Sequence, residues 1–106
     1  MRSVPRRARR PSMSAQPIPV YVLTVHARRE MRRRDIPASL VQRALLQPES
    51  RYDVRPGRIV VQSTPWLTDR GKMILLRVFL DVDRDPPEVV TVYKTGKIAK
   101  YRRIGP

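Results

Sequence analysis

The sequence contains no cysteine and no apolar run long enough to cross a bilayer. Without cysteine there is no disulfide framework and no thiolate metal site, which suits a reducing cytoplasm. The longest apolar run, from Ile18 to Val25, is far shorter than the roughly 20 residues of a spanning helix. It also lacks the small-residue cleavage site of a signal peptide. These absences predict a cytoplasmic protein that does not insert into membranes.

Acidic residues are scarce as well. The chain holds 23 lysines and arginines against nine aspartates and glutamates, a formal charge of +14. This excess predicts an anionic partner, with nucleic acid first and a membrane surface or an acidic protein second. A merely soluble basic protein would carry the same charge, so charge alone does not separate these alternatives.

The residue sets of common metal and nucleotide sites are missing too. One histidine and no cysteine leave no zinc cluster. Asp81, Asp83 and Asp85 are spaced like the start of a calcium loop, but its glycine and its final glutamate are absent. There is no glycine-rich phosphate loop. We therefore expect neither a metal nor a cofactor.

The length of 106 residues predicts one domain with a small core. Residues 1–17 hold five arginines, three prolines and no acid, which predicts a disordered tail ahead of a single α+β domain over residues 18–104. The tail is either a nucleic-acid-binding arm or an upstream extension with Met13 as the true start. Without its five arginines, 18 basic residues still face nine acids, a charge of +9.

The first half of the domain predicts a strand and two helices. Ile18 to Thr24 is a first strand, and Thr24 can cap a helix from Val25 to Arg34. A break at Asp35 to Pro37 follows, with Pro37 at the first position of a second helix that runs to Gln47. Two short helices around a proline hinge form a helical hairpin.

Strand patterns fill the second half. The expected elements are a hairpin of Tyr52 to Val54 and Arg58 to Ser63, a loop from Thr64 to Lys72 with Trp66 over the core, a long strand from Met73 to Val82, and a last strand from Glu88. The fold class is therefore α+β, with a single antiparallel sheet packed on the N-terminal helical hairpin in the order β-α-α-β-β-β-β.

The last strand gathers polar groups at its end. Alternation puts Val90 and Val92 on one face, and Thr91, Tyr93 and Thr95 on the other. At the end of this strand and beyond it, the chain supplies hydroxyl, phenol and ammonium groups, from Lys94, Thr95, Lys97, Lys100 and Tyr101. This collection predicts a surface that binds phosphate.

Two further residues are candidate site residues because of their neighbours in the sequence. Arg77 interrupts the apolar strand from Met73 to Val82, which is costly unless it faces water or an anion. His26 shares a helical stripe with Arg29, Glu30 and Arg33. By type and context alone, His26 is a solvated or capping histidine.

Two motifs resemble a known family. Thr24-x-His26-Ala27, followed by Met31, Arg34, Ile36, Val41, Leu45 and Pro48, resembles the opening of the bacterial domain of unknown function DUF4258. Thr91-Val92-Tyr93-Lys94-Thr95-x-Lys97-Ile98-x-Lys100-Tyr101 resembles its close. The likeness covers about Val20 to Arg103, and the order of elements is similar to that of RelE/ParE-like toxins.

The resemblance implies a BrnT-like or RelE-like toxin that cleaves RNA without metal, partnered by an acidic antitoxin-like protein. It also implies that His26 lies near the last strand. The sequence departs from the family pattern at Glu30, where an arginine is frequent, at Gly96, where a serine is usual, and at Pro37, where a serine caps the helix. Glu30 removes a cation from the expected phosphate site.

Cleavage through the 2′-hydroxyl needs a base, an acid and cations for the phosphorane. The expected catalytic residues are His26, Arg77, Tyr93, Lys94 and Lys97, with Glu30 orienting the histidine ring. The expected nucleic-acid contacts are Arg29, Arg33, Thr95, Lys100 and Tyr101. Two alternatives stay open: a non-catalytic RNA- or DNA-binding module in which Tyr93 packs against Phe79, and a structural protein that mates with an acidic chain.

Overall fold

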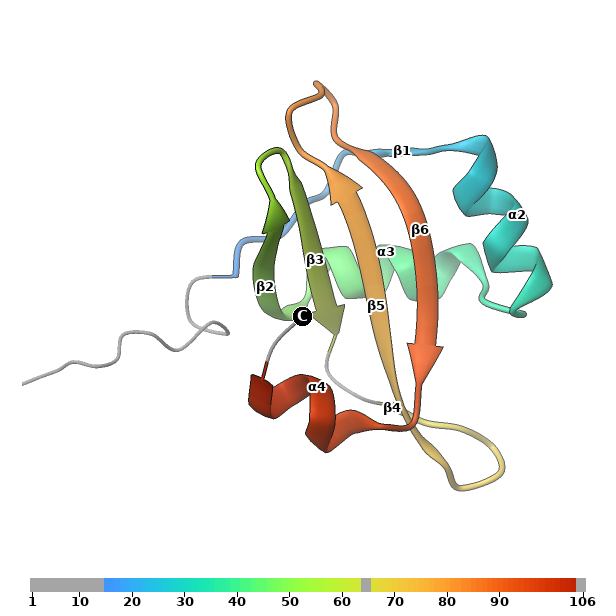
Figure 1. Cartoon of the computed structure of the whole chain (residues 1–106). Coiled ribbons are helices and arrows are strands. Elements are labelled where there is room, and N and C mark those ends of the chain that lie inside the picture. The colour runs from blue at the N-terminus through green and yellow to red at the C-terminus, as the bar shows by residue number, and fades with distance from the viewer. Residues whose placement is uncertain (1–14, 64–65, 105–106) are drawn as a thin grey trace, which may run out of the picture.

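The computed structural model describes residues 15–63 and 66–104, with only the backbone described for residues 102–104. The described part is α+β, as predicted, with one mixed sheet of six strands and three helices (Figure 1). Most of the predicted tail, residues 1–14, lies outside the described residues. The elements are β1 (Val22–Leu23), α2 (Val25–Arg33), α3 (Ala38–Leu46), β2 (Pro48–Arg55), β3 (Arg58–Ser63), β4 (Trp66–Leu67), β5 (Met73–Asp81), β6 (Glu88–Thr95) and α4 (Ile98–Ile104).

The strand order is β1-β6-β5-β3-β2, with β4 pairing separately with β5. The prediction of a purely antiparallel sheet is wrong at β1, which runs parallel to the start of β6 and pairs Val22 with Glu88. Almost the whole domain separates these two strands in the sequence, so no tight hairpin dictates an antiparallel pair. The first strand is also shorter than predicted, although Ile18 ahead of it is buried and donates its N–H to the carbonyl of Leu45 at 2.7 Å.

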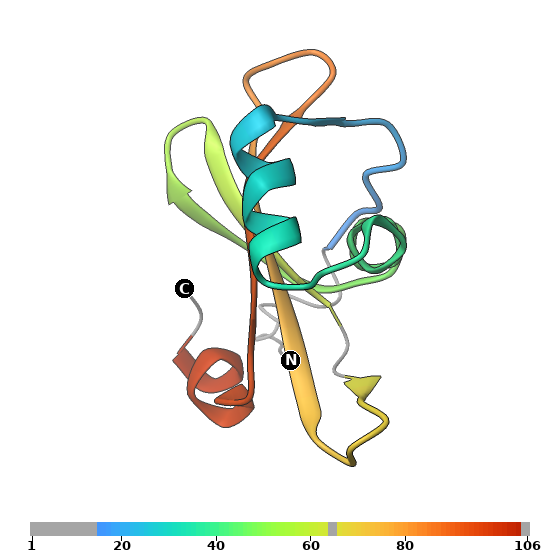
Figure 2. The ribbon, with the colours of Figure 1, turned by 90° about the vertical axis from the view of Figure 1, so that its right-hand side faces the viewer.

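The main core lies between the sheet and the two N-terminal helices. α3 covers one face of the sheet, and α2 lies alongside β6 (Figures 1 and 2). Ala27 and Met31 from α2 are buried, as predicted. The predicted apolar face of β5 is also buried at Leu76, Val78 and Leu80, but Leu75 and Arg77 on its other face are buried as well. The buried apolar cluster holds Ile18, Ala27, Met31, Ile36, Val41, Ala44, Leu45, Ile59, Val61, Leu76, Val78, Leu80, Val89 and Val92. Trp66 packs against it, as expected.

Local chemistry sets the ends of the helices. The Thr24 hydroxyl accepts the Ala27 N–H at 3.1 Å, which confirms it as the cap of α2, and donates to the Val89 carbonyl at 2.8 Å. Pro37 is the cap of α3 in an extended conformation (φ −72°, ψ 152°), and not its first helical residue. Between the helices, Asp35 adopts a positive φ of 57°. None of the helices in the described part has the length and apolar character needed to cross a membrane.

A β-bulge in β6 alters the predicted alternation. Leu80 pairs with Val89 but Phe79 pairs with Thr91, so one extra residue, Val90, enters β6 between these pairs. As a result Val89 and Val92 are fully buried and Val90 is only half-buried. The strict alternation that put Val90 and Val92 on one face is therefore interrupted at the bulge.

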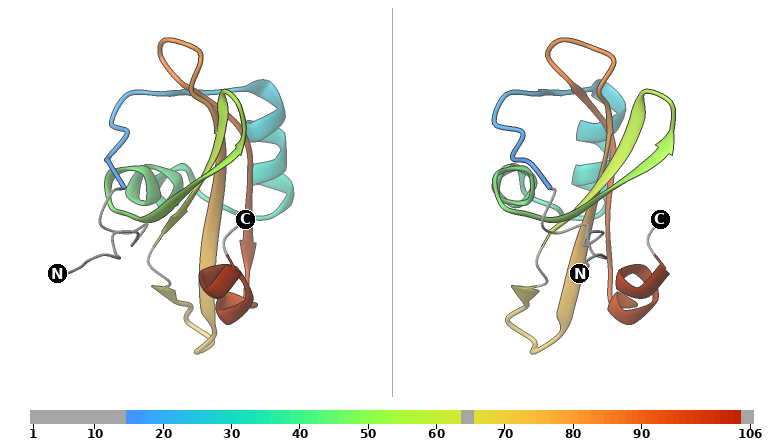
Figure 3. Two further views of the ribbon diagram at one scale, coloured as in Figure 1. Left: turned by 60° about the vertical axis from the view of Figure 1, so that its left-hand side comes forward. Right: turned by 90° about the vertical axis from the view of Figure 1, so that its left-hand side faces the viewer.

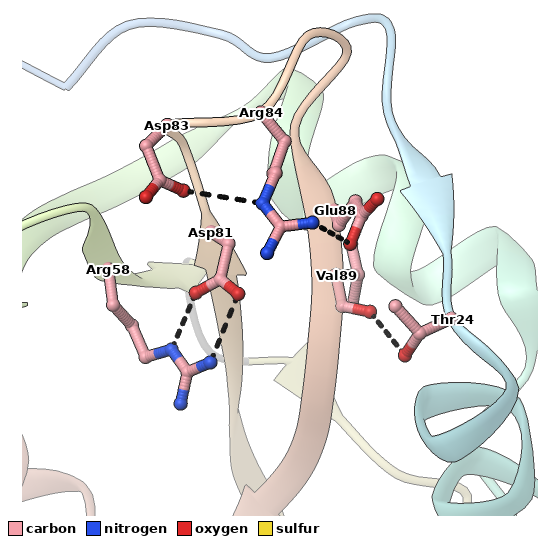
Figure 4. A network of polar contacts seen from close by, with 7 residues as sticks. All are labelled: Thr24, Arg58, Asp81, Asp83, Arg84, Glu88 and Val89. Atoms are coloured by element: carbon pink, nitrogen blue, oxygen red, sulfur yellow. Dashed lines mark hydrogen bonds and ion pairs between the residues drawn. The ribbon is translucent and has the colours of Figure 1, made fainter.

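Charged groups tie together the end of the sheet near the β5–β6 connection (Figure 4). Arg58 makes two hydrogen bonds to the Asp81 carboxylate across β3 and β5, at 2.7 and 3.1 Å. This pairing, with the nearby arginine charges, holds the pKa of Asp81 below its usual value. Arg84 lies 3.8 Å from both Asp83 and Glu88.

Replacing Asp81 by asparagine is expected to lower the free energy of unfolding by about 1 kcal/mol at neutral pH, because the pair is bidentate and only partly exposed. Since its folded pKa is depressed, the carboxylate stabilises the fold above its unfolded pKa, and this contribution disappears as the pH falls through the folded pKa. Urea unfolding of both proteins from pH 7 downward should show the difference shrinking. Asp83→Asn, whose ion pair is long and exposed, is the control. A difference that does not change with pH would contradict the assignment.

Candidate functional site

The face of the sheet opposite α3 carries an unusual set of side chains around Arg77. The strand register places Gln62 on one side of Arg77 and Tyr93 on the other. The C-terminal helix α4 lies against this face, at the end of the sheet where β6 finishes (Figures 2 and 3). It brings Tyr101 over the guanidinium, whose carbon lies 4.2 Å from the centre of the Tyr101 ring.

Arg77 is buried, with only 3% of its surface exposed. Its Nε donates to Gln62 Oε1 at 2.9 Å, and its Nη1 donates to the Tyr93 hydroxyl. The Gln62 amide is held in turn by a 3.2 Å hydrogen bond to the Ser50 hydroxyl. A row of polar groups across β2, β3, β5 and β6 therefore fixes the orientation of the guanidinium.

The third nitrogen of the guanidinium, Nη2, is buried and has no hydrogen-bond partner among the described residues. Ion pairs among the described residues join other arginines to Glu30, Asp81, Asp83 and Glu88. Arg77 takes part in none of these ion pairs. A buried cation with an unsatisfied donor is destabilising unless an anion or another acceptor reaches it. Arg77 is thus a candidate group for binding an anion.

Aromatic rings surround the same guanidinium. Phe79 and Tyr93 stack at 5.9 Å between centres, so the predicted packing of these two rings is confirmed. The Arg77 guanidinium carbon lies 5.4 Å from the centre of each. Tyr101 meets Tyr93 edge to face at 6.4 Å. The attraction of a cation to ring faces offsets part of the desolvation of Arg77.

The pKa values of Tyr93 and Tyr101 are shifted in opposite directions. Burial, together with the neighbouring Tyr101 hydroxyl, raises the pKa of Tyr93. The pKa of Tyr101 is lowered by its hydrogen bond with Tyr93 and by the charges of Lys100, Arg77 and Lys97. Two neighbouring groups whose pKa values are pushed apart are suited to act as an acid and a base.

The structure brings together only part of the predicted catalytic set. Arg77 and Tyr93 are in contact, and the charge of Lys97 acts on Tyr101 beside them. Lys94 pairs with Leu76 and so faces the side of the sheet that carries α3, where its ammonium lies 3.5 Å from the Asp35 carbonyl. His26 is exposed at the start of α2, and no contact joins it to Arg77 among the described residues.

The predicted nucleic-acid contacts fall into two groups. Lys100, 5.3 Å from the Tyr101 ring, and Thr95, which accepts the Lys97 N–H at 3.0 Å, lie at the α4 end of the sheet. Arg29 and Arg33 are exposed on α2.

Glu30, expected to orient His26, is instead engaged by arginines. Its carboxylate lies 2.6 Å from Arg33 and 3.0 Å from Arg34. The hydrogen bond from Arg33 and the charges of Arg33, Arg34 and His26 lower its pKa. Glu30 therefore pairs with Arg33 and Arg34 of the first helix region and makes no ion pair with Arg77.

Two contributors to the site are absent from the predicted set. Gln62 orients Arg77, and Arg34 donates to the Val92 carbonyl at 2.9 Å while its guanidinium lies 5.9 Å from the centre of the Tyr93 ring. Gln62 follows three apolar residues of β3. A polar residue in such a run is the one sequence signal that could have identified Gln62 as a buried hydrogen-bonding residue.

Compared with known proteins, the chain matches no family model, no curated protein and no solved structure.

Proposed function

We propose that the protein binds RNA and cleaves it without a metal ion at the cluster of Arg77, Tyr93 and Tyr101. The observation that carries the proposal is the buried guanidinium with a free donor, held between two tyrosines whose pKa values move apart. The formal charge of +14 supports a polyanionic substrate.

In the proposed reaction the Tyr101 phenolate takes the proton of the 2′-hydroxyl, whose oxygen attacks the adjacent phosphorus. Arg77 stabilises the negative charge of the phosphorane through Nη2. The bond from phosphorus to the 5′-oxygen breaks, and that oxygen takes the proton of Tyr93. The products are a 2′,3′-cyclic phosphate and a 5′-hydroxyl. The proposal requires the phosphate to reach Nη2 beside the Tyr101 ring while the Tyr101 hydroxyl stays next to Tyr93.

We also propose that the protein is a cytoplasmic toxin of the RelE/ParE-like type, related to DUF4258 and inhibited by an acidic antitoxin-like partner. The order β1-α2-α3 followed by strands β2, β3, β5 and β6 supports this assignment, as does the excess of basic residues. Expression with and without a co-expressed acidic partner in a bacterial host tests it through growth.

A second function, RNA binding without cleavage, is favoured by one observation. Tyr101 covers the guanidinium, and Arg77 is only 3% exposed in the free protein. In this alternative Arg77 and Tyr101 hold the strand but perform no proton transfer.

The deciding experiment incubates the purified protein with RNA in excess chelator. We expect cleavage to persist in chelator, and an oligonucleotide lacking the 2′-hydroxyl at every position to remain intact although it binds. Binding to both should weaken steeply as salt is raised, because phosphate contacts release counterions. Cleavage that stops in chelator contradicts the metal-free mechanism, and salt-dependent binding without any cleavage establishes the second function.

A further inference from the structure

A groove lies on the opposite face of the sheet from the Arg77 cluster, beside β4. Trp66 pairs with Ile74, and Lys94 pairs with Leu76, two residues further along β5. Trp66 and Lys94 therefore project from the same face. The connection between the two N-terminal helices forms another wall through Asp35. Figures 2 and 3 show β4 and α4 on opposite sides of the sheet at this end.

The groove combines an aromatic ring with several cations. Its lining includes Arg70, Lys72 and Lys94, all exposed, together with the half-buried Trp66. Two carboxylates, Asp35 and Asp69, also line it, which leaves one positive charge in excess. The core supports Trp66 from one side while the ring also lines the groove. A supported ring beside ammonium groups is the arrangement that binds a nucleotide, by stacking of the base and attraction of the phosphate.

The loop that carries two of these cations is held by its own hydrogen bonds. Thr68 donates its N–H to the Lys72 carbonyl at 2.8 Å, and its hydroxyl accepts the Lys72 N–H at 3.1 Å. Gly71 closes the turn with a positive φ of 79°, a conformation that glycine adopts without strain. Lys72 is thus presented at the groove by an ordered turn.

We propose that this groove is a second binding site for single-stranded nucleic acid, in which Trp66 stacks on one base and Lys72 and Lys94 hold the flanking phosphate. The inference rests on the proposed function for the choice of RNA as the natural ligand. It accounts for the position of Lys94, which faces away from Arg77. A strand bound at Arg77 reaches the groove by passing the end of β6, where Lys97 lies.

Trp66 is the only tryptophan of the chain, so its fluorescence reports directly on the groove. The probe is a short oligodeoxyuridine at low salt, which binds without being cleaved. We expect saturable quenching, with Lys72→Gln and Lys94→Gln each raising the Kd about three- to tenfold through the lost phosphate contact. Arg55→Gln, which removes an exposed cation from the end of β2, should leave the Kd within about twofold.

Two further measurements separate this site from the Arg77 cluster. Trp66→Leu should weaken binding about tenfold when binding is followed by anisotropy of a labelled oligonucleotide, because a base loses its stacking partner. In Arg77→Gln the oligonucleotide should still quench Trp66 saturably, because Arg77 and Trp66 lie on opposite faces of the sheet. Circular dichroism confirms that each variant is folded.

The proposal is overturned if the oligonucleotide binds by anisotropy without quenching Trp66, or if the Lys72 and Lys94 variants bind like wild type. Failure of RNA cleavage with intact quenching would reject the proposed reaction and leave this site standing. Cleavage without quenching would reject this site alone.

Discussion

A Tyr101→Phe variant is expected to bind RNA normally and to cleave it about 10²- to 10⁴-fold more slowly, the usual range for loss of a general acid or base. The phenylalanine ring keeps the stacking on Arg77, which lies 4.2 Å from the Tyr101 ring centre, so the fold and the cation contact survive. Only the hydroxyl that receives the proton is lost.

The pH dependence of cleavage adds a second test of the same residue. Because the pKa of Tyr101 is lowered by Tyr93 and by nearby cations, the wild-type rate should rise with pH as the Tyr101 phenolate forms, below the ordinary tyrosine range. At higher pH the rate should fall as Tyr93, whose pKa is raised, loses the proton needed by the leaving oxygen. The Tyr101→Phe variant should lack the rising limb.

Tyr21→Phe is the matched control for this prediction. Tyr21 is a half-buried tyrosine that packs against the main core, far in sequence from the cluster. Its variant should keep the wild-type rate and pH profile. Wild-type activity in Tyr101→Phe, or an equal loss in Tyr21→Phe, would show that the hydroxyl of Tyr101 takes no part in the reaction.

The fold was predictable where the apolar period is strong. The helices up to Gln47 follow from spacing alone, because each buries one stripe of side chains. The long strand β5 follows from its apolar run, whose centre is buried on both faces. The parallel pairing of β1 and the bulge at Val90 were not predictable. Each depends on contacts between segments distant in sequence, which a local pattern does not encode.

The candidate site was predictable only in part, for a similar reason. Arg77 stands out in an apolar strand, but its partner Gln62 depends on the strand register, and Tyr101 depends on the short helix α4. A helix of seven residues has little stability of its own and forms through packing on the sheet. The position of Lys94, by contrast, could be predicted from the sequence. Neighbouring residues of a strand face opposite sides of the sheet, so Lys94 and Tyr93 could not share a face.

Replacing Arg77 by methionine is expected to slow cleavage at the cluster by about 10²-fold or more, because the phosphorane loses its preorganised donor. The single variant should also lower the free energy of unfolding by about 1–3 kcal/mol. The reason is that it leaves the buried Gln62 Oε1 without the 2.9 Å hydrogen bond from Arg77.

Removing the buried members of the polar row together should reverse the effect on stability. In the triple variant Ser50→Ala, Gln62→Leu, Arg77→Met, the Ser50, Gln62 and Arg77 groups and the unpartnered Nη2 are gone at once. The Tyr93 hydroxyl, which also bonded to Arg77, keeps the Tyr101 hydroxyl as its partner. Buried charged groups replaced together by apolar ones of similar size are commonly neutral or stabilising by about 1–4 kcal/mol. We expect the triple variant to be at least as stable as wild type in urea, and inactive.

This comparison asks whether Arg77 is present for stability or for binding. Arg58→Met is the matched control, because Arg58 is paired with the Asp81 carboxylate and its loss should destabilise the protein. A triple variant that unfolds more than about 1 kcal/mol more easily than wild type would make Arg77 a structural arginine. A stable and inactive triple variant would mean that the chain keeps an unpaired buried cation at the expense of its own stability, which is the behaviour of a residue retained to bind an anion.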